Sequence, residues 1–318
     1  MSRKMLFVFN PKAGKGKIKM KLVEILDIFT KGGYEIIVYP TQKPQDAYYK
    51  AMEYADRVDT IVCSGGDGTL DEVVNGLMEA KSRIPVGYIP AGSTNDFANS
   101  LFFPKTMTEA AEMIVGGNIY HCDIGKFNHQ TFAYIAAFGL FTDVAYETDQ
   151  DLKNILGHVA YLLEGVKRLL DIKSYHMKVE TEDKVFEEDF IYGMITNSRS
   201  VGGFKHLTGK NVDMDDGLFE VTLIARPKNP IELQEVLSSI VMAEDTTSLI
   251  YSFKASHVRI TSDEPVSWTL DGEYGGSPTE VEIENRHRAL GIYLTSTKQE
   301  EGAGLPNVFD LDKRKIKP

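Results

Sequence analysis

Short apolar runs alternate with helical patterns from residue 4 to about residue 115, and this alternation constrains the fold more than any other feature. Residues 5–9 are predicted to be a buried strand, and residues 34–39, 60–63 and 86–89 are predicted to be three further strands. Between the first two, apolar residues recur at helical spacing over residues 18–29. Strands that alternate with helices build a parallel sheet covered by helices. The first part of the chain is therefore predicted to be an α/β domain.

After about residue 120 the pattern changes to strands in succession, which favours an antiparallel sandwich or a barrel-like all-β domain. Strands are predicted at residues 120–126, 131–138, 175–181, 185–196, 218–225, 258–261, 281–283 and 289–294. Two helices are predicted within this part, over residues 155–170 and 231–242. The stretch from residue 295 to 318 is charged and sparsely apolar, so its composition predicts a tail.

Length and charge narrow the class of protein. The chain has 318 residues, a length that favours two domains with hydrophobic cores of their own. Its 35 Lys and Arg against 46 Asp and Glu give a formal net charge of -11, which argues against nucleic acid as a partner. No apolar run approaches the length of a membrane-spanning helix, and the N-terminus has no room for a secretory signal, so we expect a cytoplasmic protein.

Cys63 and Cys122 form no metal-type cluster and are expected to be buried free thiols.

Glycine-bearing polar loops follow the predicted strands at residues 10–16, 63–70 and 90–96. In open parallel sheets, ligands bind beyond the carboxyl ends of the strands. Residues 10–16 resemble a Walker loop only superficially, since the glycine spacing differs and no Ser or Thr follows. Taken alone, these residues fit a phosphate contact or a turn with solvated lysines equally well.

The loop at residues 63–70 is more specific, because its glycines and the start of the following helix form an anion site suited to phosphates. Asp67 at its centre would repel phosphates unless a divalent cation lies between them, which favours Mg²⁺. Asp96 ends the third loop in the same way. The alternative interpretation is a glycine-rich turn in which Asp67 caps a helix. The two carboxylates together predict a nucleotide with its metal.

The run Gly65-Gly66-Asp67-Gly68-Thr69, with Asn10-Pro11 upstream and Gly92-Ser93-Thr94-Asn95-Asp96 downstream, resembles the diacylglycerol kinase catalytic-domain family. That family includes soluble bacterial lipid kinases and the sphingosine and ceramide kinases, and it is more distantly similar to NAD kinases. The resemblance covers nearly the whole chain and is closest to the bacterial diacylglycerol kinases. It implies an ATP-binding α/β domain over residues 1–122, to which residues 296–318 return, and a β-sandwich domain over residues 123–295 that carries the lipid and metal sites.

The resemblance also implies site residues. ATP would contact Asn10, Pro11, Lys12, Gly14, Thr41, Gly65, Gly66, Asp67, Gly68, Thr69, Ser93 and Thr94. The catalytic residues would be Glu273, which lies in Leu270-Asp271-Gly272-Glu273 and would serve as general base, with Asp67 and Asp96 near the phosphates and Mg²⁺. From chemistry alone, Asp271-Gly272 is a plain turn.

A second acidic cluster precedes a predicted strand, and by itself it would be a solvated turn. The resemblance implies that it holds a structural Mg²⁺ through Asp216, with the backbones of Asp213 and Leu218 beside it. Asp123 either belongs to the same charged network or is a strand-edge acid. The sequence departs from the family pattern at Ser93, where Thr is usual, at Gln45, where glycine is common, and at residues 209–211, which lack a proline.

These observations predict a kinase that transfers the ATP γ-phosphoryl group to the hydroxyl of a membrane lipid. Diacylglycerol is the acceptor that they favour most. The alternatives are another lipid hydroxyl (phosphatidylglycerol or a sphingoid base), an NAD kinase, and a nucleotide-binding regulator without catalysis. A homodimer is compatible with the sequence.

Lipid access requires transient association with the membrane surface. Lysines that could face an anionic bilayer stand at positions 12, 15, 17, 19 and 21, although a solvated helix explains them as well. Phe97 and residues 101–103 either line an acyl-chain groove or belong to the core.

Overall fold

The computed structural model describes residues 2–140, 172–199, 212–242 and 247–295. Three features of the sequence lie outside the described residues. They are the helix predicted over residues 155–170, the departure from the family pattern at residues 209–211, and the tail at residues 296–318. Among the described residues no helix is long and apolar enough to cross a membrane.

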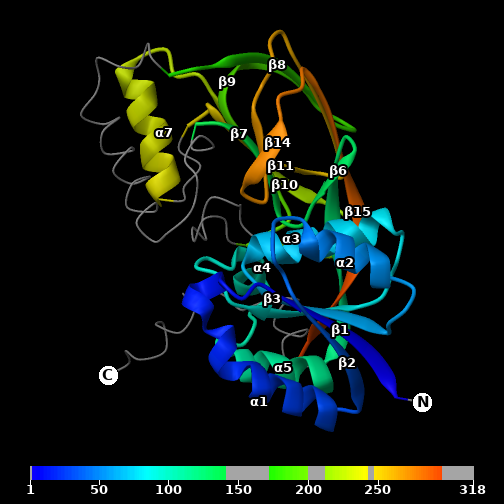
Figure 1. The fold of residues 1–318 in the computed structure, drawn as a ribbon. Helices are drawn as coiled ribbons and strands as arrows, with labels where there is room; N and C mark the ends of the chain where they lie inside the picture. The colour runs from blue at the N-terminus through cyan, green and yellow to red at the C-terminus, as the bar shows by residue number, and fades with distance from the viewer. Residues whose placement is uncertain (1, 141–171, 200–211, 243–246, 296–318) are drawn as a thin grey trace, which may run out of the picture.

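The first domain is built on a parallel sheet with the strand order β2-β1-β3-β4 (Figure 1). Its strands are β1 (Arg3–Phe9), β2 (Tyr34–Pro40), β3 (Thr60–Gly65) and β4 (Val86–Pro90). Their alternating side chains meet helices on both faces, because successive residues of a strand point to opposite sides. Met5 and Phe7 pack in one core with Phe29, while Leu6 and Val8 pack in another with Val73. Both faces of β1 are therefore buried, as predicted for residues 5–9.

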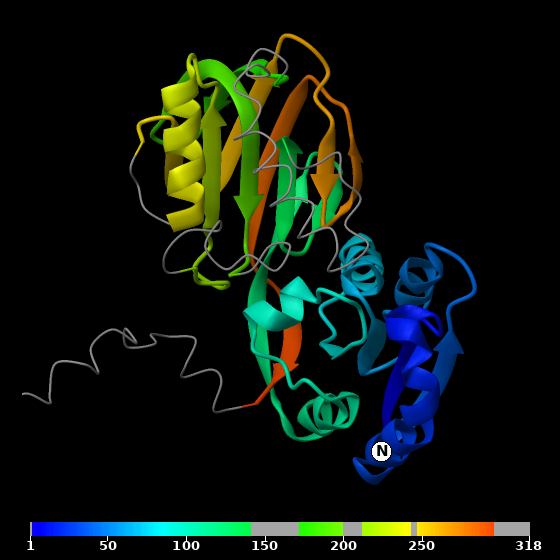
Figure 2. The ribbon, with the colours of Figure 1, turned by 90° about the vertical axis from the view of Figure 1, so that its left-hand side faces the viewer.

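Helices cover the two faces in pairs, as the two views of the ribbon show (Figures 1 and 2). The helices α1 (Ile18–Lys31) and α5 (Met107–Gly116) lie on one face. The other face carries α2 (Asp46–Tyr54) and α3 (Asp67–Glu79), which lie toward the second domain. Two short elements complete the domain, the 3-10 turn η1 (Ala13–Gly16) and α4 (Asp96–Ser100). Thr106 caps α5 by accepting the backbone N–H of Glu109.

The second domain is an antiparallel β-structure. Its strands are β5 (Asn118–Phe127), β6 (Gln130–Phe132), β7 (Ile135–Gly139), β8 (Tyr175–Glu180), β9 (Val185–Thr196), β10 (Phe219–Ala225), β11 (Ile250–Ala255), β12 (His257–Ser262), β13 (Trp268–Leu270), β14 (Glu273–Gly276) and β15 (Glu280–Leu294). Its core is rich in aromatic rings, and Trp268 lies 5.0 Å from Phe127 and 4.9 Å from Phe138 between ring centroids. The helix α7 (Pro230–Met242) packs through Leu233 and Val236.

Two long strands, β5 and β15, join the two domains. Residues 281 and 283 pair with β12, whereas Ile292 pairs in parallel with Val86 of β4. The antiparallel pairing of β15 with β5 runs along both halves, with a shift of register between Arg286 and Leu290. The separate strands predicted at 281–283 and 289–294 are thus one element, and the predicted boundary at residue 122 falls inside β5.

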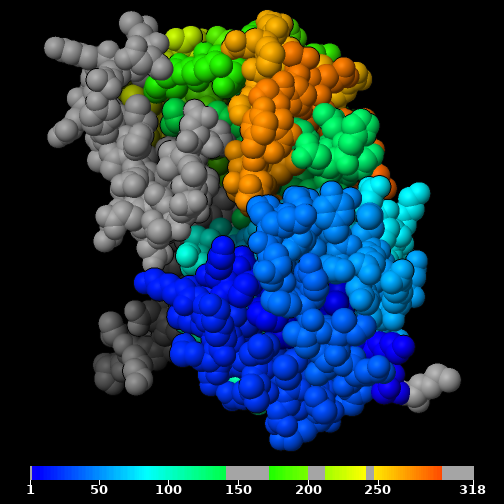
Figure 3. Space-filling model, viewed as in Figure 1, coloured from blue at the N-terminus to red at the C-terminus, as the bar shows by residue number. Residues whose placement is uncertain are grey.

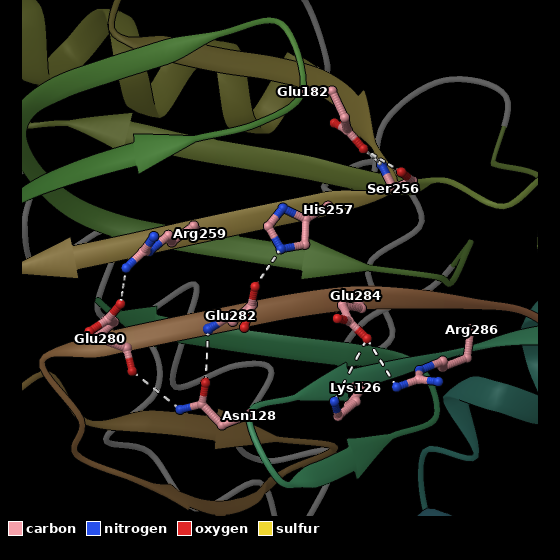
Figure 4. Close-up of polar contacts among 10 residues, drawn as sticks. All are labelled: Lys126, Asn128, Glu182, Ser256, His257, Arg259, Glu280, Glu282, Glu284 and Arg286. Atoms are coloured by element: carbon pink, nitrogen blue, oxygen red, sulfur yellow. Dashed lines mark hydrogen bonds and ion pairs between the residues drawn. The ribbon is translucent and has the colours of Figure 1, made fainter.

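The outer face of β15 carries a row of acids, each paired with a basic side chain (Figure 4). Glu280 pairs with Arg259, Glu282 with His257, and Glu284 with both Lys126 and Arg286. The intervening Val281 and Ile283 are buried, as the period of two along a strand requires. This charged row is therefore the solvated side of the sandwich.

Candidate active site

A cleft of about 1060 Å³ lies where the carboxyl ends of the parallel strands face the second domain. The space-filling view shows the two domains in contact around it (Figure 3). Most of the predicted site residues meet here: the cleft is lined by Asn10, Lys12, Gly14, Thr41, Gly66, Gly68, Thr69, Ser93 and Glu273. Among the predicted nucleotide-binding and catalytic residues, five do not appear in its lining, namely Pro11, Gly65, Asp67, Thr94 and Asp96, and the predicted metal residues Asp213, Asp216 and Leu218 lie elsewhere. Each of the five is in the same loop or helix start as a lining residue.

The glycines allow the three loops to pack backbone against backbone. A Cβ at Gly14 would lie 2.2 Å from the carbonyl oxygen of Ala91, and one at Gly92 would lie 2.6 Å from the Cα of Gly66. Backbone bonds between the loops add to this packing, since the N–H of Asn10 donates to Ser64 and that of Ala91 donates to Gly65. No larger residue fits these positions without displacing its neighbour. The first turn of α3, which follows Gly66, leaves N–H groups without intrahelical acceptors at the cleft, as an anion site requires.

Asp67 lies behind the glycine loop and links it to the next loop. Its Oδ2 accepts the backbone N–H of Asp96 at 3.1 Å, and the N–H of Phe97 bonds to the same carboxylate. Its Oδ1 is buried and has no hydrogen-bond partner within the described parts of the chain. Burial and the neighbouring Asp96 carboxylate together raise the pKa of Asp67 to about 7. Asp67 therefore caps a helix, as the alternative interpretation predicted. The helix that it caps is α4, and its Oδ1 does not take part in the cap.

That free oxygen, beside the buried carboxylate of Asp96, fits a divalent cation. Hard cations prefer carboxylate oxygens, and a positive charge would offset both the burial and the mutual repulsion of the two acids. Asp67 and Asp96 are thus the residues that would hold Mg²⁺ near phosphates bound at the glycine loops. The role of the ion there would be to neutralise phosphate charge.

Glu273 faces the glycine loop from the opposite wall of the cleft. It is exposed at the start of β14, and its Oε1 lies 3.9 Å from the position that a Cβ would take at Gly68. A turn in which Asp271 and Gly272 both adopt positive φ brings the chain to this point. The Asp271-Gly272 pair is therefore a turn, as its chemistry suggested, and this turn presents Glu273 to the cleft.

Two further acids at this turn were missed by the sequence reasoning. The buried carboxylate of Asp271 accepts the backbone N–H groups of Ala133, Tyr134 and Ile135. Asp71 of α3 lines the cleft, and burial together with the charge of Asp271 raises the pKa of Asp71 well above its ordinary range. Asp71 follows Asp67 by four positions, so helical spacing places both on one side of α3. That spacing was a usable signal for Asp71, whereas no local pattern pairs it with Asp271.

The wall beside Thr41 is closed by Glu72. Its two carboxylate oxygens accept the N–H of Gln45 at 2.8 Å and that of Ala47 at 3.0 Å. Gln45 has a φ of 69°, in the left-handed region, which accounts for the frequent glycine at this position in the resembled family. The departure at Gln45 is accommodated, and Thr41 still lines the cleft.

The predicted structural metal site lies on the loop before β10. The two oxygens of Asp216 are engaged, one by the N–H of Leu218 and the other by the Lys254 ammonium at 2.7 Å. A cation here would compete with that ammonium, so this loop fits Mg²⁺ less well than the Asp67 site. No group of three His, Cys, Asp or Glu suited to a metal ion occurs in the described ranges. The assignment of Asp213, Asp216 and Leu218 stays a prediction.

Asp123 holds the acidic loop in place. It is fully buried, and its oxygens accept the N–H groups of Gly217 and Arg288 at 2.7 Å each, while its own N–H donates to Met214. Asp215 of the same loop pairs with Arg288. Asp123 thus holds the loop through hydrogen bonds to backbone N–H groups, and its place in a charged network around a metal stays a prediction.

The aromatic run after Asp96 is mostly core. Phe97, Leu101 and Phe103 are buried, whereas Phe102 is partly exposed beneath the guanidinium of Arg199. The core interpretation therefore holds for these three side chains. Cys63 and Cys122 are buried free thiols, as predicted.

The fold and the cleft define a class of protein: an α/β domain with a glycine-lined anion site, joined to a β-sandwich that contributes an acid opposite it. Residues 4–127 match the diacylglycerol kinase catalytic domain, and residues 136–292 match the YegS C-terminal NAD kinase beta sandwich-like domain. The chain belongs to the diacylglycerol kinase catalytic-domain family. The resemblance and the two-domain fold class inferred from the sequence are confirmed.

Several relatives are similar to this chain over nearly its full length. A diacylglycerol kinase from Bacillus subtilis (strain 168) is 34% identical, covering 92% of this chain and 97% of its own length. A diacylglycerol kinase from Staphylococcus epidermidis is also 34% identical, over 87% of each chain. The crystal structure of a diacylglycerol kinase from Bacillus anthracis str. Sterne shares the fold, with a TM-score of 0.71, 24% identity and coverage of 93% and 98%. A second crystal structure from that organism gives a TM-score of 0.77 at 26% identity with the same coverage.

Proposed function

We propose that this protein is an ATP-dependent lipid kinase whose preferred acceptor is diacylglycerol, giving phosphatidate and ADP. The observation that carries this proposal is the position of Glu273, whose Oε1 faces Gly68 of the glycine loop across the cleft. A carboxylate there is placed to activate an acceptor hydroxyl beside a phosphate bound to the loop amides. Membership of the diacylglycerol kinase family, which implies ATP use, supports the same reaction.

In this reaction Glu273 takes the proton of the lipid hydroxyl as its oxygen forms a bond to the γ-phosphorus. The bond between that phosphorus and the β–γ bridging oxygen breaks, and ADP carries the electron pair away. Phosphoryl transfer needs little covalent chemistry from a protein, so positioning and charge neutralisation supply most of the acceleration. The loop amides and Lys12, which is exposed in the cleft, serve this purpose. Proton removal by a general base is typically worth about 100-fold to 10,000-fold in rate.

The lipid must reach this cleft from a bilayer, and α1 offers the surface for that approach. Met20 and Val23 are each 80% exposed on this helix, although both are apolar. Lys15, Lys17 and Lys19 are exposed around them. Aliphatic side chains flanked by lysines suit an anionic membrane surface, to which each lysine contributes about 1 kcal/mol. We therefore assign the α1 face, defined by Met20, Val23 and these lysines, as the membrane contact.

The acceptor is tested with the purified chain, Mg²⁺ and ATP labelled in the γ position. Separate mixed micelles contain diacylglycerol, phosphatidylglycerol or a sphingoid base, and one reaction contains NAD. We expect labelled phosphatidate with diacylglycerol and much less product elsewhere. If another lipid or NAD is labelled preferentially, that compound and not diacylglycerol is the acceptor. If the chain binds nucleotide but no labelled product forms, the result favours the alternative of a nucleotide-binding regulator without catalysis.

A further inference from the structure

A second pocket lies beside the cleft, at the boundary between the two domains. Its volume of about 790 Å³ is within the usual range for small-molecule sites. Residues at the end of α3 and in the loop that leads to β4 line it, together with residues of the β5–β6 hairpin and of β15 near its register shift. Four residues line both cavities, namely Tyr48, Asn75, Gln130 and Thr131. The proposed phosphoryl transfer gives this second pocket no role.

The second pocket is basic, although the chain as a whole carries a formal net charge of -11. Among the described residues that line it, Glu79 is the one acid, whereas four are lysines or arginines: Lys81, Arg83, Lys126 and Arg286. Positive charges gathered in one cavity repel one another and attract anions. The charge of the lining therefore favours an anionic ligand. We call this cavity the basic pocket and define it by these four side chains.

Ion pairs balance only part of that charge. Lys126 and Arg286 both pair with one carboxylate, that of Glu284, at 3.7 Å and 3.0 Å (Figure 4). The side chains of Lys81 and Arg83 make no ion pair or hydrogen bond within the described parts of the chain. Even when Glu284 is counted, four cations face two acids in and around the basic pocket. A phosphate dianion would balance the difference.

Lys81 has a backbone conformation that lysine seldom adopts. Its φ is 54°, in the left-handed region, at the position after the end of α3 where glycine is usual. The N–H of Lys81 donates to Met78 at 3.1 Å and that of Ser82 donates to Leu77 at 3.0 Å, which closes the helix end. Glycine would make the same backbone contacts without the cost of a Cβ. The turn itself therefore does not require a lysine, and an anion in the basic pocket would give this side chain a role.

We propose that the basic pocket binds a phosphate monoester. The lysine and arginine side chains hold the phosphate, since both residue types pair strongly with phosphate oxygens. Met78 and Ala289, two partly buried apolar residues of the lining, contact the carbon part of the ligand. The ligand lies beside the cleft and leaves the glycine loops to the nucleotide. This assignment goes beyond the proposed function and does not depend on it.

A phosphate monoester can be a soluble compound or the headgroup of a lipid such as phosphatidate. The helix α1 carries the assigned membrane contact, whereas α3 lies on the opposite face of the parallel sheet (Figures 1 and 2). The sheet therefore separates a bilayer at α1 from the basic pocket. For this reason we expect a soluble ligand.

The first test is a calorimetric titration with glycerol 3-phosphate, a soluble phosphate monoester. A non-hydrolysable ATP analogue and Mg²⁺ are present in excess, so that the glycine loops are occupied. The pocket variant combines Lys81→Gly with Arg83→Gln, which removes the two cations that lack ion pairs among the described residues. We expect the wild type to bind the probe and the pocket variant to bind it more weakly by about fivefold or more. Added salt should weaken wild-type binding, because the attraction is between charges.

The matched control combines Lys105→Gln with Lys228→Gln. Both lysines are exposed and do not line the basic pocket, and the net charge changes by the same amount. The control should bind the probe as the wild type does. The proposal is overturned if the wild type does not bind the probe, if the pocket variant binds it equally well, or if the control is weakened as much as the pocket variant.

Folding of the pocket variant is checked by thermal unfolding. Glycine suits the φ of residue 81, so the variant should be at least as stable as the wild type. If the double variant is nevertheless unstable, Arg83→Gln alone against Lys105→Gln alone makes the same comparison.

Sedimentation with vesicles of phosphatidylcholine and phosphatidate distinguishes the two sources. If the ligand is soluble, the wild type and the pocket variant sediment equally, although they differ in binding glycerol 3-phosphate. If the pocket variant sediments less, the lipid headgroup is the phosphate monoester that the pocket binds. None of these measurements uses phosphoryl transfer. A failure of the proposed function therefore leaves this assignment unchanged, and the reverse also holds.

Discussion

The backbone N–H of Asp96 donates to Oδ2 of Asp67 at 3.1 Å, so the acid after one glycine loop caps the helix that begins at the end of the next. The same carboxylate has a second, buried oxygen without a partner in the described residues. Asp67 therefore fixes the relative position of two loops, and its second oxygen is the one that would contact a bound cation. Replacing Asp67 should therefore affect both the contact between the loops and the binding of a cation. The dependence of stability on pH should distinguish these two effects.

Asp67→Asn tests the second role through its pH dependence. Because burial raises the pKa of Asp67 to about 7, the protonated form is favoured in the metal-free fold, and stability should be lost as pH rises through about 7. In the presence of a chelator, this loss should shrink in the Asn variant. Added Mg²⁺ should stabilise the wild type more than the variant above pH 7, measured by thermal unfolding. Equal stabilisation of both by Mg²⁺ would remove Asp67 from the metal site.

Glu273→Gln should lower kcat by about 100-fold to 10,000-fold, since glutamine keeps the size of the side chain but cannot accept the proton. The Kd for ATP should stay within about twofold of wild type, because Glu273 lies on the wall opposite the glycine loops. Single-turnover transfer to diacylglycerol and a direct nucleotide-binding titration measure the two effects. Near-normal transfer in this variant would assign proton removal to another group.

Gly92→Ala should disrupt the contact between the two glycine loops. The added Cβ would lie 2.6 Å from the Cα of Gly66, which is backbone and has no rotamer in which to move away. Overpacking of this kind typically costs about 1–3 kcal/mol, and ATP affinity should fall with it. Gly116→Ala is the matched control, because nothing lies within 4 Å of its added methyl group. Urea unfolding and nucleotide titration of both variants make the comparison; equal behaviour would contradict the loop packing.

The α1 face is tested by Met20→Glu combined with Val23→Glu, which exchanges two exposed apolar side chains for acids. Sedimentation with vesicles that contain anionic lipid should show weaker binding by about tenfold or more, since apolar burial is lost and repulsion is gained. Val185→Glu is the control, because Val185 is 62% exposed on the second domain. If the control variant loses as much binding as the α1 variant, the membrane contact is not confined to α1.

Much of the first domain could be predicted because its signals are local. The apolar runs of the parallel sheet and the helical face from Ile18 to Phe29 appear in the structure as predicted elements. The helix α2 was missed, since its buried apolar positions, Ala47 and Ala51, are small alanines rather than large aliphatic residues, and its start depends on the distant Glu72 carboxylate. The run 131–138 was predicted as one strand, but it divides into β6 and β7 where Ala133 and Tyr134 bond to Asp271.

The site residues also divide into those that sequence motifs predict and those whose relation depends on tertiary packing. The glycine loops, Thr41 and Glu273 could be predicted from motifs, and the structure gathers them in one cleft. The proximity of Asp71 to Asp271 could not, because it depends on how the second domain folds back over α3. A local acid pattern specifies which side chains are available, and tertiary packing determines which of them raise one another's pKa.

The passage of β15 through both sheets also bears on how the chain could be divided. Residues 4–127 produced alone would lack Ile292, which pairs with Val86, and would leave β4 as an open edge. Unpaired strand edges invite aggregation. The two domains are therefore expected to mature together, with the catalytic sheet completed only after the ribosome has delivered the last strand.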